Sequence, residues 1–371
     1  MRIAIIADPV DEQYAGVHIY VKEVIKSLLK NDTENTYVFV HTRENSFFAN
    51  TEHYIIPNYR NIPAYASFRI LFLVPRLLKT LKLDAVWNMN HSGPFNLPKY
   101  ILRINTILDL TPVLLPQVHL SMSTIIHKIF LPIIVKNSDL LLCYSDNTVN
   151  DLLRLYPRAQ GKTAMIYLGK DPMFVPTNDS AVLQKYGIYE PYILYLGTIE
   201  PRKNVACLVE AYEFLRQRTK LKHKLVIAGK KGWKYEPIIA KIMNSPFKED
   251  ILVTDYVSRE DMPALYTGAA VFVFPSIYEG FGLPLLEAMA CGTACVSSNA
   301  SSLPEVGGDA VLYFDPTKSE QLSVALQNVL SNQAIKSDLQ KKALLQATLF
   351  SWDEYAKKVM PLFANLANEK K

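Results

Sequence analysis

Two glutamates stand on either side of an apolar segment in the sequence FVFPSIYEGFGLPLLEAMACG, residues 272–292. Glu279 precedes a glycine-containing turn, and Glu287 follows it among leucine and methionine side chains. A carboxylate in apolar surroundings is costly unless a cation or a hydrogen-bond donor pairs with it. The pattern therefore predicts that either the protein or a ligand supplies a partner for these carboxylates.

The turn between the two glutamates predicts a site for an anion. AVFVFPS is typical of a buried strand, Pro284 suits the first position of the next helix, and Gly292 suits its end. Backbone N–H groups at a helix start attract negative charge, and such a helix would begin at the carboxyl edge of the sheet. The N–H groups in question belong to Gly280, Phe281, Gly282 and Leu283.

Glu287 would lie one turn inside this helix, where its carboxylate could accept two hydrogen bonds from a vicinal diol such as ribose. Glu279 is placed to touch whatever extends beyond the phosphates. The alternative is structural, because the helix dipole alone favours acidic residues near a helix start.

A second candidate is YLGTIEPRKN, residues 195–204. A predicted strand ends at Leu196, a turn follows at Gly197, and Arg202 and Lys203 stand just before the next helix. Two cations at the carboxyl end of a strand suit a diphosphate. A solvated basic loop is the alternative.

A third candidate is Gly16 in DEQYAGVHIY, between the first predicted strand and the first long helix. Glycine lets the backbone approach a ligand closely, although a simple turn would also explain it. No GxGxxG and no GxxxxGK[ST] pattern is present, so neither a nicotinamide cofactor nor a P-loop is supported.

The elements that must position these residues are strands alternating with helices, which predicts parallel, doubly wound α/β sheets. The alternation pauses at a segment rich in Pro, Asp and Asn near residues 170–191 and then begins again. We therefore expect two Rossmann-like domains, at 1–172 and 187–350, followed by a closing helix at 352–371. Ligands of such sheets bind at the carboxyl ends of the strands, in a cleft between two facing domains.

Composition and charge restrict the classes of ligand and the compartment that we expect for this protein. The 371 residues carry a net charge of +5, a mild excess that favours anionic ligands or lipid surfaces. Basic residues do not cluster with aromatic ones, so we expect no nucleic acid partner. Four scattered cysteines favour a reducing compartment, and no signal peptide or membrane-spanning run of ~18 to 20 apolar residues is evident, so we expect a cytoplasmic protein.

Together, GTIEPRKN and the E-x7-E segment closely resemble the retaining glycosyltransferases of the GT-B fold, family 4. SSLPEVGGDAVLYFDP also resembles that family, and weaker likeness covers nearly the whole chain. The resemblance implies a GT-B architecture in which the last helix crosses back to the first domain. It implies that the first domain binds an acceptor and the second a nucleotide-sugar donor.

The resemblance also assigns roles. Lys203 and Arg202 would hold the diphosphate, Glu287 the ribose, and Glu279 with the amides after it the donor sugar and its phosphate. Tyr256, in the turn TDYVS, would lie near the base, and Gly16 would approach the phosphates from the first domain. No cofactor or metal is expected, because cations and a helix start can stabilise the leaving diphosphate and no DxD-like pair ends a strand.

The chain departs from the family pattern at two places. Many members carry a basic residue directly after the strand glycine, where Thr198 stands here. Many also have a histidine where this chain has Leu108, which is followed by Asp109. Asp109 is the first candidate for the orienting role of that histidine, and His91 and His119 are others.

The resemblance implies transfer of a hexose to a glycan or lipid-linked acceptor in surface polysaccharide or lipopolysaccharide synthesis, with GDP-mannose as the first candidate donor. A nucleotide-sugar epimerase or phosphorylase of the same fold, and a sugar-nucleotide-binding subunit without catalysis, are the alternatives. Segments 65–83 and 122–139 mix apolar and basic residues and could lie on an anionic membrane. Core helices with one solvated face would show the same mixture.

Overall fold

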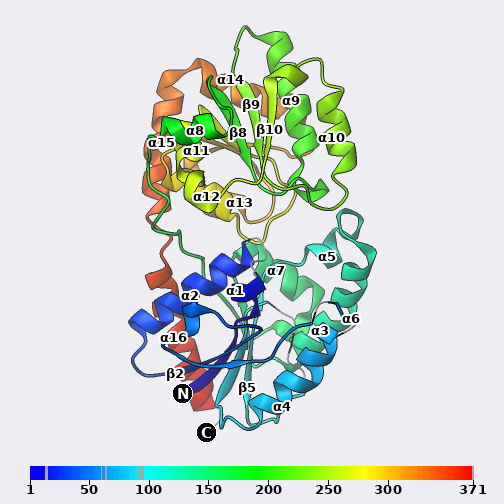
Figure 1. Cartoon of the computed structure of the whole chain (residues 1–371), viewed down its shortest axis with the longest axis vertical. Helices are drawn as coiled ribbons and strands as arrows, with labels where there is room; N and C mark the ends of the chain where they lie inside the picture. Colours follow the sequence, from blue (N-terminus) through cyan, green and yellow to red (C-terminus); the bar gives the residue numbers. More distant parts are fainter. Residues whose placement is uncertain (13–15, 60, 63–64, 91–92, 94–95, 370–371) are drawn as a thin grey trace. The chain divides into compact units, whose positions relative to one another are not determined.

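The computed structural model describes residues 1–12, 16–59, 61–62, 65–90, 93 and 96–369. The chain forms two compact units (Figure 1). The first unit comprises Met1–Leu114, Ser121–Gly169 and Ser351–Lys371. The second comprises Lys170–Phe350 together with Leu115–Leu120, a short segment from the first half of the chain.

The first unit contains one parallel sheet, whose seven described strands are ordered β3-β2-β1-β4-β5-β6-β7. Most of these strands are short apolar runs buried on both faces, as a parallel sheet covered by helices requires. The strands are β1 (Arg2–Ile6), β2 (Thr36–His41), β3 (Glu52–Ile55), β4 (Ala85–Asn88), β5 (Leu102–Ile107), β6 (Leu140–Cys143) and β7 (Thr163–Met165).

Helices follow most of these strands and cover the sheet (Figure 1). They are α1 (Asp8–Glu12), α2 (Val17–Asn31), α3 (Tyr65–Phe68), α4 (Val74–Leu78), α5 (Thr111–Leu114), α6 (Ser121–Asn137), α7 (Asp146–Leu155) and α16 (Trp352–Glu369). A π-helical turn, Arg69–Leu73, joins α3 to α4.

The closing helix α16 packs against α2 of the first unit. The Ser27 hydroxyl donates to the Trp352 carbonyl over 2.7 Å, and Lys30 forms an ion pair with Asp353 at 2.6 Å. This confirms the prediction that the last helix returns to the first domain.

The second unit repeats the parallel arrangement, with six described strands ordered β10-β9-β8-β11-β12-β13. They are β8 (Tyr192–Leu196), β9 (Lys224–Ala228), β10 (Ile251–Asp255), β11 (Val271–Phe274), β12 (Cys295–Ser298) and β13 (Val311–Phe314). The helices are α8 (Ser180–Lys185), α9 (Val205–Arg218), α10 (Glu236–Met243), α11 (Met262–Gly268), α12 (Leu283–Ala290), α13 (Leu303–Gly307), α14 (Ser319–Ser331) and α15 (Gln333–Ala347). Two doubly wound α/β sheets are present, as predicted.

Strand order in the second sheet reverses between β8 and β11, which pair in parallel. Loops leaving two such strands turn to opposite faces of the sheet, so a crevice opens at their carboxyl ends. The loop after β8 carries Arg202 and Lys203, and the loop after β11 carries Glu279. The two candidate segments are therefore neighbours in space although they are about 76 residues apart in sequence.

Two glycines let the chain pass closely beside itself at this end of the sheet. Gly197 follows β8, and Gly229 follows β9 with φ +148°. A Cβ atom added at Gly229 would lie 2.0 Å from the Gly197 carbonyl oxygen. Only glycine fits there without moving the loop that leads to Arg202 and Lys203.

We expect the substitution Gly229→Ala to lower the free energy of unfolding by about 3 kcal/mol or more, because it combines backbone strain with a backbone clash. Gly187→Ala is the matched control, since Gly187 also has a positive φ but nothing lies within 4 Å of its added Cβ. The control should cost only about 1 to 2 kcal/mol. Urea unfolding of both variants measures the difference, and equal losses would contradict the steric argument.

Candidate functional site

Arg202, Lys203 and Glu279 form a buried cluster of charges. The two cations lie in a single 3-10 turn, Pro201–Lys203, after β8. Arg202 Nη1 lies 2.8 Å from Glu279 Oε2, and Lys203 Nζ lies 2.6 Å from Glu279 Oε1. Each carboxylate oxygen thus meets its own cation, and all three side chains are largely buried.

Within this cluster, burial and the neighbouring charges shift each pKa in opposite directions. Burial alone would raise the pKa of Glu279, but Arg202 and Lys203 outweigh it and lower that pKa to about 2. Burial lowers the pKa of Lys203, and Glu279 opposes that change. Glu200, which is 2.8 Å from Arg202, has a raised pKa because of burial, offset by the two cations. Glu279 is therefore the anion that keeps the two cations charged in a buried place.

Side chain to backbone hydrogen bonds hold the two loops together. Asn204 adopts the left-handed conformation, with φ +58°, and its amide donates to the carbonyls of Pro275 and Pro316 over 3.1 and 2.8 Å. The Glu279 N–H donates to the Ser301 hydroxyl over 2.8 Å. Sequence patterns assign no role to Asn204, Ser301 or Glu200. Asn204 and Ser301 bond to residues 71 and 22 positions away, which local sequence does not reveal. Glu200 pairs with Arg202 inside the candidate segment 195–204, and nothing in the sequence distinguishes it there from a solvated acid.

Hydrogen bonds and aromatic packing hold the turn from Gly280 to Leu283 in place. The Ser302 hydroxyl donates to the carbonyls of Glu279 and Phe281 over 3.0 and 2.7 Å. The Phe281 ring is buried and meets Phe350 edge to face at 5.8 Å. Gly282 is the N-cap of α12 with φ +118°, a conformation that favours glycine. The turn is thus rigidly built, and binding of a phosphate by its amides stays a prediction.

Glu287 lies on α12 with a different set of partners. Its carboxylate accepts a hydrogen bond from the Tyr266 hydroxyl over 3.2 Å, and Arg259 Nη1 is 3.6 Å away. Burial raises the pKa of Glu287 to about 7, although Arg259 and Tyr266 oppose the rise. Arg259 also pairs with Asp171 at 2.8 Å. The protein therefore supplies partners for both glutamates. Their pKa values differ, so that near neutrality Glu279 is fully ionised and Glu287 about half ionised.

Two other predicted donor-binding residues lie at this end of the second unit. Tyr256 follows β10, is 57% exposed, and has Lys230 Nζ 4.3 Å from its ring centroid. The carbonyl of Thr198 accepts a hydrogen bond from the Tyr195 hydroxyl over 2.9 Å. The predicted residues of the second unit thus lie on the loops after β8, β10 and β11, at the carboxyl side of the sheet, except for Leu283 and Glu287 on α12.

Asp109, His119 and His91 are the candidates for the role of the histidine that many family members have at the position of Leu108. Asp109 belongs to the first unit, where its carboxylate accepts hydrogen bonds from the N–H and hydroxyl of Thr111 over 3.0 and 2.6 Å at the start of α5. His119 groups with the second unit and stacks on Trp233, with ring centroids 5.7 Å apart. His91 lies outside the described residues. The orienting role of Asp109 stays a prediction.

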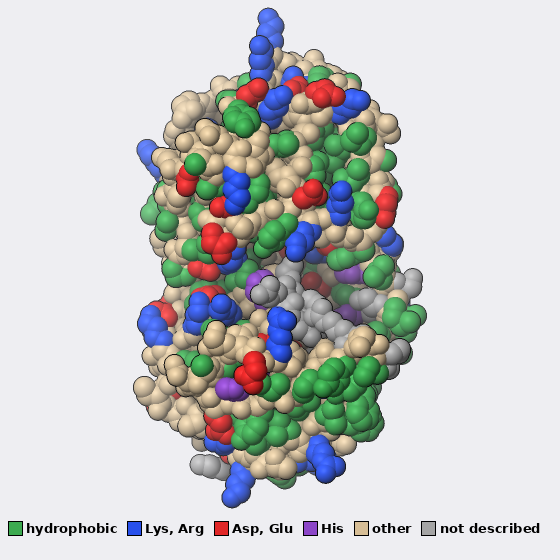
Figure 2. All heavy atoms as spheres, viewed as in Figure 1, with side chains coloured by type: hydrophobic (Ala, Val, Ile, Leu, Met, Phe, Trp, Pro, Cys, Tyr) green, Lys and Arg blue, Asp and Glu red, His purple; other side chains and the backbone are tan. Residues whose placement is uncertain are grey.

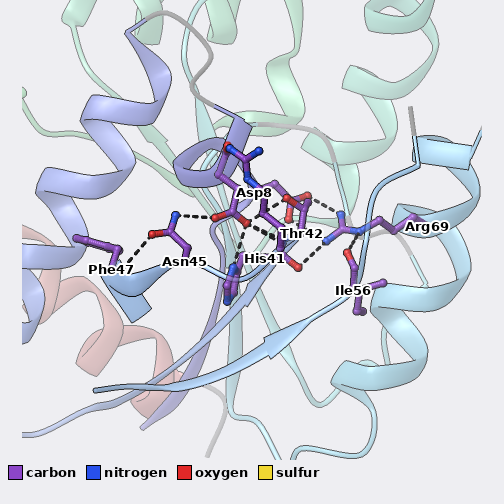
Figure 3. A network of polar contacts seen from close by, with 9 residues as sticks. Asp8, His41, Thr42, Asn45, Phe47, Ile56 and Arg69 are labelled. Carbon is purple, nitrogen blue, oxygen red and sulfur yellow. Dashed lines mark hydrogen bonds and ion pairs between the residues drawn. The ribbon is translucent and has the colours of Figure 1, made fainter. Parts of the chain in front are cut away.

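The first unit carries its own polar network at the carboxyl ends of β1 and β2 (Figure 3). Asp11 accepts hydrogen bonds from His41 Nδ1 at 3.0 Å, the Thr42 N–H at 2.8 Å and the Asn45 amide at 2.8 Å. Burial raises the pKa of Asp11, but the hydrogen bonds from His41 and Asn45 outweigh it, so that pKa is well below its ordinary value. The network anchors the start of the segment that leads to Gly16.

Gly16 itself is the N-cap of α2, with φ +76°. Nothing lies within 4 Å of an added Cβ, so the constraint on this position is its backbone conformation and not a lack of space. The predicted approach of Gly16 to a phosphate stays a prediction.

Comparison with known proteins identifies the family. The sequence pattern of "Glycosyl transferases group 1" matches residues 181–346, which include the charge cluster and Glu287. The chain is 30% identical over 370 residues to the O-antigen chain mannosyltransferase B of Escherichia coli, covering 95% of this chain and 97% of that protein. The chain belongs to the glycosyl transferases group 1 family.

A further relative and a solved structure are similar to this glycosyltransferase in sequence and in fold, respectively. It is 35% identical over 184 residues to the serotype-specific mannosyltransferase WbdA of Escherichia coli, a match of 49% of this chain to 23% of that longer protein. The crystal structure of Anabaena HepE in complex with UDP-glucose superposes with a TM-score of 0.77, at 14% identity, covering 98% of this chain and 100% of that one. The predictions of a family 4 enzyme and a GT-B fold are confirmed.

The described residues contain neither a metal-binding cluster nor a membrane-spanning helix. No three His, Cys, Asp or Glu side chains in the described part of the glycosyltransferase gather as a metal site would require. Among the helices that are described, none is both long and apolar enough to cross a bilayer.

We predict that Glu287 makes the stability of the glycosyltransferase pH-dependent. Its pKa rises from 4.5 to about 7 on folding, so the folded state binds this proton more tightly than the unfolded chain does. The free energy of unfolding should therefore decrease as pH rises from about 4.5 to about 7, by about 3 kcal/mol from this group.

Glu287→Gln should abolish that slope. Subtracting the pH profile of urea unfolding of this variant from that of the wild type isolates the contribution of Glu287. Glu236→Gln, at an exposed position, is the control and should leave the profile unchanged. A flat difference between about pH 5 and pH 8 would contradict the prediction.

Proposed function

We propose that this protein is a retaining, metal-independent mannosyltransferase that moves mannose from GDP-mannose to a glycan or lipid-linked acceptor during surface polysaccharide synthesis. The observation that carries the proposal is the pair of cations, Arg202 and Lys203, anchored by Glu279 at the switch point of the second sheet in a chain of this family. The second unit then binds the donor and the first unit the acceptor.

The cation pair suits the chemistry of the donor. A nucleoside diphosphate leaves with negative charge, so Arg202, Lys203 and the amides at the start of α12 would stabilise the transition state more than the ground state. Because the cluster already holds Glu279, its cations are prepositioned and do not have to be ordered when the donor binds. Fixed cations of this kind can replace a divalent metal.

Glu287 suits the ribose of the donor. Its carboxylate accepts a hydrogen bond from Tyr266 and keeps further acceptor capacity for a diol. Arg259 would favour the ionised form, which accepts stronger hydrogen bonds. Tyr256, exposed at the same side of the sheet, offers a ring face to the base.

Mannose is proposed as the transferred sugar because two relatives in Escherichia coli are named as mannosyltransferases, one of them similar over nearly the whole chain. The first of these names also supports an O-antigen-like acceptor. We further propose that the enzyme acts in the cytoplasm, at the inner face of a membrane that carries its acceptor.

The donor is tested by thermal unfolding with a panel of nucleoside diphosphates. GDP at about 100 times its Kd should stabilise the folded state by about 2.7 kcal/mol and raise the Tm, with UDP and ADP giving smaller shifts. Lys203→Met should lose most of the GDP shift. Lys241→Met is the control, because Lys241 pairs with Glu210 at the surface. A larger shift with UDP than with GDP would refute the proposed donor.

The mechanism is tested with Glu279→Gln. Front-side attack, with the leaving phosphate taking the acceptor proton, predicts that transfer falls about a hundredfold or more while GDP binding persists, because Glu279 would order the two cations and position the sugar without forming a covalent bond to it. Glu320→Gln, which alters an exposed ion pair with Arg218, should leave transfer unchanged. The anomeric configuration of the product and activity in EDTA are read in the same assay. A covalent sugar on Glu279, an inverted product or activity restored only by Mn²⁺ would count against the proposal.

A further inference from the structure

The first unit presents a helix whose outward face is apolar. Helix α6 packs inward through Leu131, Ile134 and Val135, which are nearly fully buried. The opposite face repeats at helical spacing and consists of Met122, Ile125, Ile126, Ile129 and Ile133, between 39% and 68% exposed. A surface helix of a globular protein ordinarily turns polar residues outward, so this face marks an interaction site.

A second exposed face lies on the continuous helical stretch formed by α3, the π turn and α4, residues 65–78. Phe68 and Phe72 are 48% and 58% exposed, with ring centroids 5.3 Å apart. Arg76 and Lys79 follow them at the same spacing and are also exposed. Figure 2 shows apolar side chains gathered over this part of the first unit. The exposed face of this stretch is therefore aromatic at Phe68 and Phe72 and basic at Arg76 and Lys79.

The stretch is fixed firmly to the sheet beneath it. Arg69, only 2% exposed, donates to both carboxylate oxygens of Asp8 over 2.5 and 2.9 Å and to the Ile56 carbonyl over 2.7 Å (Figure 3). Val74 and Leu78 are fully buried. The inward side chains thus hold the stretch in place, and Phe68 and Phe72 are exposed on a rigid support.

The sequence around both faces is depleted of acids. From residue 53 to residue 138 the chain has nine Lys and Arg but only two acids, Asp84 and Asp109, a net charge of +7 against +5 for the whole chain. Lys128 and Lys136 on α6 are exposed as well. Both apolar faces therefore belong to a stretch of sequence with a net positive charge, whereas the rest of the chain is slightly negative.

We propose that these two faces dock the enzyme on an anionic lipid membrane, with the isoleucines of α6 and the phenylalanines of α3 and the π turn entering the interface and Arg76, Lys79 and Lys136 meeting the headgroups. Apolar side chains flanked by Lys and Arg are what an interfacial helix uses. A second copy of the chain fits less well, because a symmetric contact would bring like charges together. A glycan fits less well because isoleucine and phenylalanine offer no hydrogen bonds to hydroxyl groups.

Flotation of the full-length protein with vesicles tests the proposal. The protein should float with vesicles of equal parts phosphatidylcholine and phosphatidylglycerol and not with phosphatidylcholine alone. Ile125→Ser with Ile129→Ser should weaken partitioning about tenfold or more for each isoleucine removed. Arg76→Gln with Lys79→Gln should weaken it about fivefold for each cation removed.

Matched controls lie on the second unit. Leu345→Ser with Leu349→Ser removes two side chains that are each 70% exposed, and Lys220→Gln with Lys248→Gln removes two exposed cations. Neither pair should change flotation. The Tm and the GDP-induced shift should be unchanged in all four variants, which shows that they fold and bind donor.

Several results would overturn the membrane proposal. Equal flotation with neutral vesicles, or variants that float like the wild type, would exclude the assigned surface. A dimer in light scattering that the isoleucine variant dissociates would make the face a contact between copies, and retention on acceptor polysaccharide without vesicle binding would make it a glycan site. The inference deepens the proposed location of the enzyme but needs no donor chemistry, so vesicle binding without a GDP shift would refute the proposed donor and leave this inference standing.

Discussion

The site depends on one interaction, the contact of a single buried carboxylate, Glu279, with two cations that are adjacent in sequence. Removing a charge from water is costly, and two like charges side by side would repel each other. Glu279 offsets both costs, because each of its oxygens lies within 2.8 Å of Arg202 or Lys203. The loops after β8 and β11 are thereby fixed to each other, and Asn204 and Ser301 complete that attachment through backbone hydrogen bonds. A buried ion pair is weak evidence for stability alone, but here it explains how cations persist at a place suited to a diphosphate.

The two glutamates of one short segment differ because their neighbours differ. Glu279 faces two cations at hydrogen-bonding distance and is held ionised, whereas Glu287 faces a tyrosine and a more distant arginine, so that burial dominates and raises its pKa to about 7. The two residues are of the same type, so their different surroundings explain the difference. Glu279 stays ionised and orders two cations, whereas the ionisation of Glu287 depends on pH near neutrality. Two carboxylates with pKa values pushed apart are a frequent mark of a functional site, and this agrees with membership of a glycosyltransferase family.

The first unit shows the same principle with a different outcome. Its polar pairs, Asp8 with Arg69 and Asp11 with His41, hold the segments after β1 and β2 to the sheet. Its exposed surface, in contrast, carries isoleucine and phenylalanine on α6, α3 and the π turn, close in sequence to lysine and arginine. The internal network stabilises the first unit and positions the segments that follow β1 and β2. The exposed surface costs solubility unless it has a partner, which is why it indicates an interaction site.

The sequence by itself determined the alternation of buried strands and helices, because continuous apolar runs and amphipathic repeats are local signals. It indicated Glu279, Glu287, Arg202 and Lys203 as chemically significant, and the likeness to a known family gave the fold and the return of α16 to the first unit. The half-exposed edge strand β3 has only a weak local signal, because an edge position does not require an apolar run. Only the tertiary structure decided which charge meets which. The order of parallel strands is set by crossover connections, so β8 and β11 become neighbours, and Arg259 reaches Glu287, through contacts that leave no mark on the local sequence.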